Sequence, residues 1–195
     1  MIDTIRTNDS DRGQVGIGTL IIFIALVLVA AVAAGVLIDT SGQLESRASD
    51  TGADAQAEVS NQVEVVSATG VDSDGTTGVE QIELVVKKSA GSDPIDLSGT
   101  TIQYTSDSAS ATLNFDSGGA SSTAFGTSQV GSSGPTTVLE NTDERVTIII
   151  DANAVEGSDL SEGSNVDLEI VDQSGASTVY GVNVPDVLTN EYVPV

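Results

Sequence analysis

A stretch without a charged residue, residues 13–38, constrains what this chain can fold into more than any other feature. From residue 15 to residue 38, only Gly16, Gly18, Thr19 and Gly35 are not plainly apolar. As a helix, this segment extends about 36 Å at about 1.5 Å per residue, enough to cross the roughly 30 Å hydrocarbon core of a bilayer. A helix that is apolar on every side must be buried on every side. The segment therefore needs either a membrane or other protein chains around it.

The residues around this stretch argue against an ordinary secretory signal, which ends its apolar region at a small-residue cleavage site. Alanines between positions 30 and 34 offer small residues, but the apolar run continues past them to Ile38. The more distinctive junction is Asp11-Arg12-Gly13-Gln14, in front of the run. An uncleaved membrane anchor is the competing interpretation.

At this junction the chain resembles a known family. A short polar leader, Arg12-Gly13, then Gln-Val-Gly-Ile-Gly-Thr-Leu and a long aliphatic segment are similar to the archaellins, or archaeal flagellins, of haloarchaeal type. The resemblance implies that a prepilin-peptidase-like membrane protease cuts between Gly13 and Gln14, so that the helix stays on the mature protein. Bacterial type IV pilins have a similar leader but carry Glu at the fifth mature position, which is Gly18 here.

Copies of the same helix can replace the membrane as its surroundings after cleavage. Burying about 20 aliphatic side chains at roughly 1.5 kcal/mol each gives some tens of kcal/mol before entropy is subtracted. Small residues in the second half of the run let neighbouring helix backbones approach closely. We expect the filament-core packing to involve Ile17, Leu20, Ile24, Leu28, Ala31, Val32, Gly35 and Leu37.

The charge balance is strongly acidic, with 6 basic and 29 acidic residues, a net charge of −23 and a pI of about 4.1. Nucleic acid and anionic lipid headgroups are therefore poor partners. Such a charge repels itself in a packed polymer, but at about 1 M salt the Debye length falls to roughly 3 Å. We interpret the acidity as the surface of a protein from a hypersaline habitat; the alternative is a generally acidic secreted protein.

Several kinds of chemistry are excluded by composition. The chain has no Cys and no His, which rules out Ser-His-Asp and Cys-His nucleophiles and the usual zinc sites. Asp151, Asn153 and Glu162 stand at positions one, three and twelve of a calcium loop, but Val155 and Glu156 occupy places that require other residues. We therefore predict an acidic turn there, no metal site, no cofactor and no enzymatic activity.

Apolar periodicity predicts that the helix continues beyond the uncharged stretch. Leu44, Ala48, Ala55, Val59, Val63 and Val66 recur at helical spacing. The simplest domain division is a cleaved leader at 1–13, a filament-core helix at 14–66 and a head domain at 67–195. A break in the helix between residues 39 and 42 is the structural alternative.

Alternating apolar residues predict strands in the remainder. The predicted strands are 81–87, 101–105, 111–115, 137–139, 145–150, 166–171 and 178–184. Short strands separated by Gly, Ser, Asp and Asn favour an antiparallel sandwich, and the resemblance implies an immunoglobulin-like β-sandwich. The fold class is thus α+β, a long N-terminal hydrophobic helix followed by this head. Residues 116–135, rich in Ser and Gly, are predicted to be an exposed loop.

The resemblance implies a structural subunit of the archaellum, an extracellular swimming filament. Its partners would be copies of itself and other archaellins, the processing protease and the archaellum motor, and the precursor would be inserted in the membrane. Basic residues of the leader favour a cytoplasmic location for the leader. Its one N-x-[ST] sequon, Asn8-Asp9-Ser10, would be lost on cleavage. The alternatives are an adhesive pilus subunit and a membrane-anchored β-sandwich binding protein.

Overall fold

The computed structural model describes residues 6–73, 78–130 and 136–195, with side chains from residue 13 onward. The chain divides into two units, Met1–Gly52 and Ala53–Val195. The described residues of the first unit, from Arg6 onward, are helical. The second holds the end of that helix and all of the β-structure.

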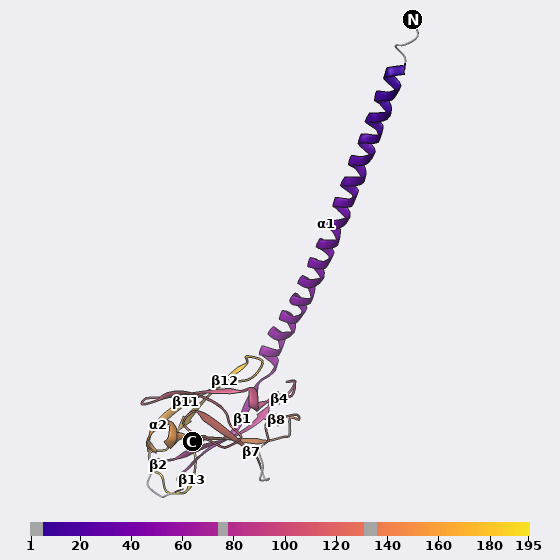
Figure 1. Ribbon diagram of the computed structural model, residues 1–195. Coiled ribbons are helices and arrows are strands. Elements are labelled where there is room, and N and C mark those ends of the chain that lie inside the picture. Colours follow the sequence, from indigo (N-terminus) through magenta and orange to yellow (C-terminus); the bar gives the residue numbers. More distant parts are fainter. Residues whose placement is uncertain (1–5, 74–77, 131–135) are drawn as a thin grey trace. The chain divides into compact units, whose positions relative to one another are not determined.

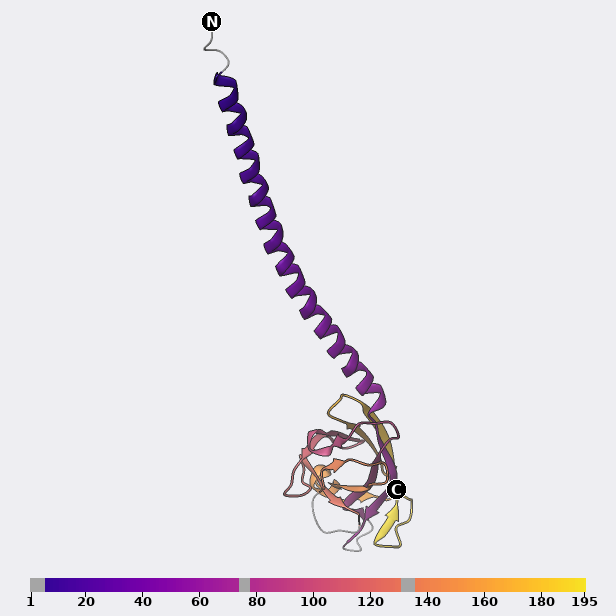
Figure 2. The same cartoon turned by 90° about the vertical axis from the view of Figure 1, so that its right-hand side faces the viewer.

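One continuous helix, α1, runs from Arg6 to Ser60 and is drawn unbroken in both views (Figure 1 and Figure 2). Its 55 residues correspond to about 80 Å at the usual helical rise. The predicted alternative of a break between residues 39 and 42 is wrong. Thr40 donates its hydroxyl to the carbonyl of Val36 at 2.7 Å, and Gly42 lies inside the helix.

The helix ends at Ser60, six residues before the predicted end at residue 66. Contacts with a distant loop explain the early end. The Ser92 hydroxyl donates to the carbonyl of Ser60 at 2.8 Å, and the side-chain oxygen of Asn61 accepts the Asp93 N–H at 2.9 Å. Val63 then begins a strand and is only 3% exposed. Head contacts thus override the helical spacing that had assigned Val63 and Val66 to the helix.

Within the described residues, nine strands form one hydrogen-bonded sheet in the order β12-β11-β5-β6-β7-β9-β3-β1-β13. Their bounds are β1 (Val63–Val71), β3 (Gln81–Lys88), β5 (Thr101–Ser106), β6 (Ser110–Phe115), β7 (Ala124–Gln129), β9 (Val146–Asp151), β11 (Asn165–Val171), β12 (Ser177–Asn183) and β13 (Tyr192–Pro194). Two short pairs accompany the sheet, β2 (Gly78–Val79) with β10 (Leu160–Ser161) and β4 (Ile95–Asp96) with β8 (Val138–Leu139). A 3₁₀ turn η1 (Leu97–Gly99) and a short helix α2 (Ala152–Glu156) complete the head.

The sheet is antiparallel except where β6 meets β7, which pair in parallel through Asn114 with Ala124 and Phe115 with Phe125. This short pairing links two antiparallel halves into one continuous sheet. The Thr178 hydroxyl of β12 donates to the carbonyl of Val63 in β1 at 3.0 Å, so the sheet folds back on itself. The predicted long helix and mostly antiparallel head are confirmed, and the immunoglobulin-like sandwich is an approximate description of the head.

Strand alternation builds one core between the two halves of the sheet. Inward residues of β3 and β9, such as Leu84 and Ile148, join those of β5 and β11, such as Ile102 and Leu168, in a single buried cluster. Each of these four side chains is fully buried. The seven strands predicted from alternation all occur, and no end differs from its predicted position by more than one residue.

The predicted exposed loop at residues 116–135 is wrong in its middle, because β7 lies there. Phe125 is fully buried and packs edge to face on Phe115, with ring centroids 5.9 Å apart. At Gly126 an added Cβ would lie 3.3 Å from the Gly119 Cα, so the two backbone segments approach more closely than a larger residue easily allows. Positions 131–135 of the predicted loop lie outside the described residues.

Candidate functional site

The first half of α1 exposes an apolar surface that its own chain leaves uncovered. Every large apolar side chain between residues 15 and 38 is 50% to 71% exposed. The predicted packing residues belong to this surface, since Ile17, Leu20, Ile24, Leu28, Ala31, Val32, Gly35 and Leu37 are all exposed. Whether these particular residues pack in a filament stays a prediction.

This surface surrounds the helix. At about 100° per residue, most of the predicted packing residues fall on one side of α1, centred near Ile17 and Leu28. Ile22, Leu26 and Val29 lie on other sides and are equally exposed. A single partner along one stripe would leave half of the apolar surface in water. The helix therefore needs neighbours, or lipid, on all sides.

By length and composition, the segment Gly13–Ser60 is the one candidate membrane span among the described residues. A bilayer and a bundle of identical helices make the same demand on it, which is an apolar exterior without charge. A helix sequence that suits a bilayer therefore also suits a bundle of identical helices.

The predicted cleavage junction lies inside the helical segment. Gly13 and Gln14 are exposed, and the side chain of Arg12 lies outside the described part of the chain. A Cβ added at Gly13, Gly16 or Gly18 would meet nothing within 4 Å. Packing within the described part of the chain thus does not require glycine at these positions.

The second half of α1 is amphipathic. Leu44, Ala48, Ala55 and Val59 lie on one side, as the helical spacing predicts for these four. Asp39 and Asp50 lie opposite this stripe, and Asp54 and Glu58 continue from Asp50 in steps of four residues toward its edge. Arg47 lies on the same side, and all five side chains are exposed. We call the four carboxylates the acidic face of α1. Its charge contrasts with the uncharged first half of the same helix.

The calcium-loop residues serve separate structural roles. Asp151 caps α2 by accepting the N–H of Ala154 at 2.8 Å, and Asn153 donates its side-chain amide to Asp159 at 2.5 Å. Glu162 accepts the N–H of Leu188 at 2.9 Å. Among the described residues, no group of three or more His, Cys, Asp or Glu side chains is placed to hold a metal ion.

A polar contact inside the head was not foreseen. Tyr104 is fully buried, and its hydroxyl donates to Glu156 at 2.8 Å, while Ser108 donates to the other carboxylate oxygen. Partial burial acts to raise the pKa of Glu156, but the hydrogen bonds from Ser106, Ser108 and Tyr104 outweigh it and lower that pKa. The sequence could have indicated this contact, because Tyr104 stands at an inward position of an alternating strand and a buried Tyr hydroxyl needs a hydrogen-bond partner.

Known proteins share both parts of this architecture. The chain matches the family model of archaeal-type flagellin over residues 13–182. It is 43% identical over 187 residues to flagellin B2 of Halobacterium salinarum, with 95% of each chain covered. These matches do not favour the alternatives of an adhesive pilus subunit or a membrane-anchored binding protein.

Two solved structures have the same fold. The chain in the archaeal flagellum of Methanospirillum hungatei strain JF1 aligns with a TM-score of 0.70 at 24% identity, over 92% of this chain and 99% of that one. The crystal structure of archaeal flagellin FlaB1 from Methanocaldococcus jannaschii aligns with a TM-score of 0.61 at 19% identity, over 69% of this chain and 96% of that one. With an unpartnered apolar helix, a β-structured head and a family match that begins at Gly13, the chain belongs to the archaeal-type flagellins and is a structural, non-enzymatic subunit of a motility filament.

Proposed function

We propose that the chain polymerises through α1, after removal of residues 1–13, into an extracellular swimming filament with the helices inside and the heads outside. The exposed apolar surface of α1 between residues 15 and 38 carries this proposal. Water cannot be its working surroundings, because full exposure of so many aliphatic side chains forgoes some tens of kcal/mol of burial. Copies of α1 supply the missing surface on all sides.

Processing follows from the same surface. The precursor is inserted in the membrane through α1, and a prepilin-peptidase-like protease cuts between Gly13 and Gln14, with Arg12 on the leader side. The cut removes Arg6 and Arg12 together with Asp3, Asp9 and Asp11. The next charged side chain is that of Asp39, so apart from the new α-amino group the mature helix begins with an uncharged stretch that can leave the bilayer and enter a bundle.

The partners in the filament are copies of this chain and related flagellins. Packing involves Ile17, Leu20, Ile24 and Leu28 with their neighbours, and Ala31 and Gly35 allow close approach of the backbones. A motor complex at the base turns the filament, and the stiffness of the helical bundle transmits the torque. The subunit performs no chemistry in this process.

The experiment that tests the proposal is intact mass measurement and N-terminal sequencing of the protein in filaments sheared from cells. We expect a chain that begins at Gln14 and retains residues 15–38. A chain that has lost the whole apolar segment, or a protein that is absent from sheared filaments and stays uncut in the membrane, contradicts the proposal. Swimming of a deletion strain, with and without the restored gene, separates motility from attachment.

A further inference from the structure

The basic residues of the head gather at one end of the sheet. Between residues 61 and 195 the chain has only Lys87, Lys88 and Arg145 as Lys or Arg. Lys87 and Lys88 end β3, and Arg145 directly precedes β9, whose Val146 pairs with Val86. We call these three residues the basic end of the head. No other Lys or Arg occurs between residues 61 and 195.

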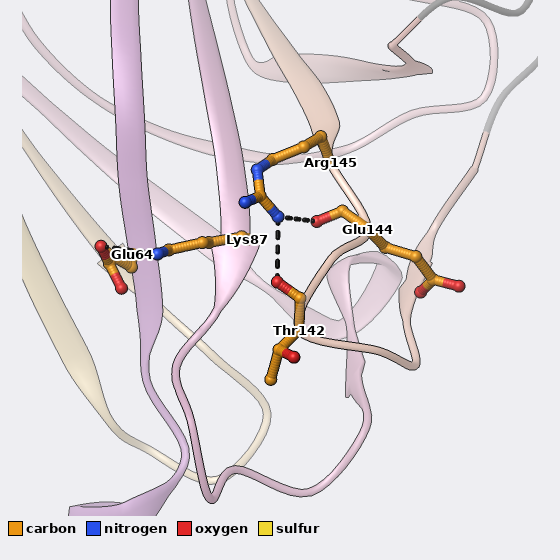
Figure 3. Close-up of polar contacts among 5 residues, drawn as sticks. All are labelled: Glu64, Lys87, Thr142, Glu144 and Arg145. Atoms are coloured by element: carbon orange, nitrogen blue, oxygen red, sulfur yellow. Dashed lines mark hydrogen bonds and ion pairs between the residues drawn. The ribbon is translucent and has the colours of Figure 1, made fainter.

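Figure 3 shows how two of these cations are held. Lys87 forms an ion pair with Glu64 at 2.9 Å, the one ion pair among the described residues. Arg145 donates from Nη1 to the carbonyls of Thr142 and Glu144, both at 2.9 Å, and keeps its other guanidinium N–H groups. Lys88 donates to the carbonyl of Ser92 at 3.0 Å. Lys88 and Arg145 are thus oriented by backbone carbonyls, and among the described residues neither forms an ion pair.

The acidic residue next to these cations is already engaged. Glu144 accepts the N–H of Asn141 and of Glu140, at 3.0 and 2.6 Å, and the side-chain amide of Asn141 at 3.1 Å. The backbone hydrogen bond from Asn141, its side-chain amide and the positive charge of Lys88 lower the pKa of Glu144. Glu144 therefore stays ionised and holds its own turn, while Lys88 lies nearby without an ion-pair contact to it in the described structure.

The basic end lies where the head joins α1. Lys88 pairs with Val63, the first residue of β1, and it bonds to Ser92, whose hydroxyl reaches the last helical carbonyl at Ser60. If α1 helices form the inside of a filament, as proposed, the end of each head next to Ser60 is the part closest along the chain to the helices. Unpaired carboxylates are costly to bury among apolar helices, so the proposed arrangement requires the acidic face of α1 to lie on the outside of the helical layer.

We propose that Lys88 and Arg145 of one subunit contact the carboxylates of Asp50, Asp54 and Glu58 on α1 of a neighbouring copy. The inference rests on the proposed function, because it requires α1 helices to be packed beneath the heads. It identifies a second interface, between the head of one copy and the helix of another, in addition to the apolar contacts of the first half of α1.

High salt decides what such an interface can do. At about 1 M salt, charges separated by more than roughly 3 Å hardly interact, so general attraction between a basic and an acidic surface disappears. Direct pairs that are partly buried between two layers are screened much less. The contact therefore contributes register, because it is made only where a cation and a carboxylate touch, and it repeats at every subunit.

The test is a charge cycle in sheared filaments, with dissociation temperature in concentrated salt as the readout. Lys88→Gln should lower that temperature by several degrees. The matched control Asn183→Asp, which lowers the net charge equally at an exposed site on β12 opposite Asn165, should leave it unchanged. Lys88→Glu and Asp54→Lys should each weaken the filament, and together they should restore most of the loss. Equal behaviour of Lys88→Gln and Asn183→Asp, or no restoration in the double variant, overturns the inference.

Failure of the proposed function gives a different result. Leu28→Asp should abolish filaments if α1 forms the inside, whatever the basic end does. Filaments that survive Leu28→Asp contradict the proposed function itself. Filaments that are lost with Leu28→Asp while Lys88→Gln behaves like its control contradict only the head-to-helix contact.

A zero-length carbodiimide cross-link checks the contact directly, because it forms an amide only between a Lys amine and a carboxylate that touch. Filaments treated in this way should yield linked peptides that join Lys88 of one chain to Asp50, Asp54 or Glu58 of another. Lys88→Arg, which keeps the positive charge but cannot be coupled, is the control and should lose the link. Filaments in which Lys88 is joined to none of these three residues contradict the proposal.

Discussion

The two regions of this molecule use the same aliphatic residues in opposite ways. Leu28 in α1 is 61% exposed, whereas Leu84 in β3 is fully buried. The head alternates its apolar residues and buries them against its own second layer. The first half of α1 is apolar on every side and has no such layer. One region is stabilised by its own chain, and the other depends on neighbours.

This difference separates folding from assembly. A change in the core of the head should act on a single chain, whereas a change in the first half of α1 should act only when copies meet. The two kinds of stability are therefore measurable with matched substitutions, one in each region.

The largest expected effects come from placing a charge in each region. Leu84→Asp should unfold the head, because a buried unpaired carboxylate costs several kcal/mol, a large part of the stability of a domain. Leu28→Asp should leave the head folded and prevent assembly, because the same charge would be buried among helices. Hydrogen exchange of the head amides and electron microscopy of sheared material measure the two outcomes. A head that loses protection in Leu28→Asp would contradict the separation.

A smaller effect is expected from Phe125→Ala. Phe125 is fully buried in β7 and contacts Phe115 at the parallel junction between the two halves of the sheet. The substitution should destabilise the head by about 3–5 kcal/mol. Denaturant unfolding of the Ala53–Val195 unit, expressed alone, gives this value. The matched change in α1, Phe23→Ala, should leave unfolding of the head unaltered when both are measured in the full chain.

The contact between Tyr104 and Glu156 tests polar stabilisation in the head. Glu156→Ala leaves a fully buried hydroxyl without its partner and should cost about 1–3 kcal/mol. Tyr104→Phe removes the buried hydroxyl itself, so no buried donor is left without a partner, and it should cost less than Glu156→Ala. Equal losses in the two variants would show that the hydroxyl finds another partner.

The same carboxylate predicts a dependence on pH. The pKa of Glu156 is lowered in the folded head by its three hydrogen bonds, which outweigh partial burial. Its contribution is therefore complete above the ordinary pKa of a Glu and is lost as the pH falls through the lowered value. Unfolding curves of wild type and Glu156→Gln should converge in acid. A gap that widens in acid would contradict the assignment.

The smallest expected effects come from two glycines. Gly157 ends α2 with φ of 80°, so Gly157→Ala should destabilise the head by about 1 kcal/mol. Gly42→Ala should stabilise isolated α1 by about 1 kcal/mol, because the added Cβ meets nothing within 4 Å. Thermal unfolding and filament dissociation measure both. If Gly42→Ala weakens the filament, a neighbouring backbone lies against that glycine.

Much of the fold could be predicted because its patterns are local. The uncharged run identifies the helix, and alternation in segments such as 81–87 and 166–171 identifies strands with one buried face. The apolar surface of α1 was likewise visible in the sequence. The grouping of Lys88 and Arg145 at one end of the head was not visible in the sequence. The two residues lie 57 positions apart and are brought together only by the pairing of β3 with β9.

The errors arose where distant contacts decide the local structure. Val63 and Val66 continue a helical spacing, yet Ser92 and Asp93 engage the chain at Ser60 and Asn61 and the helix ends there. β7 was hidden in a Ser- and Gly-rich stretch with a single aromatic residue, Phe125. Composition is a weak guide where one aromatic side chain provides most of the burial.

The pairing of β1 with β13 has a consequence for the order of events during export. Val71 lies beside Tyr192, and Asp72 donates its N–H to the carbonyl of Glu191 at 2.9 Å, so contacts between residues more than a hundred positions apart complete the sheet. Such contacts form late, because the closure of a long loop precedes them. The pairing of β1, which follows α1, with β13 is therefore completed only when the C-terminal residues are available. If the head is exported while α1 is held in a membrane, as proposed, a partly exported subunit lacks β13 at this edge, and only a fully translocated subunit has the complete sheet.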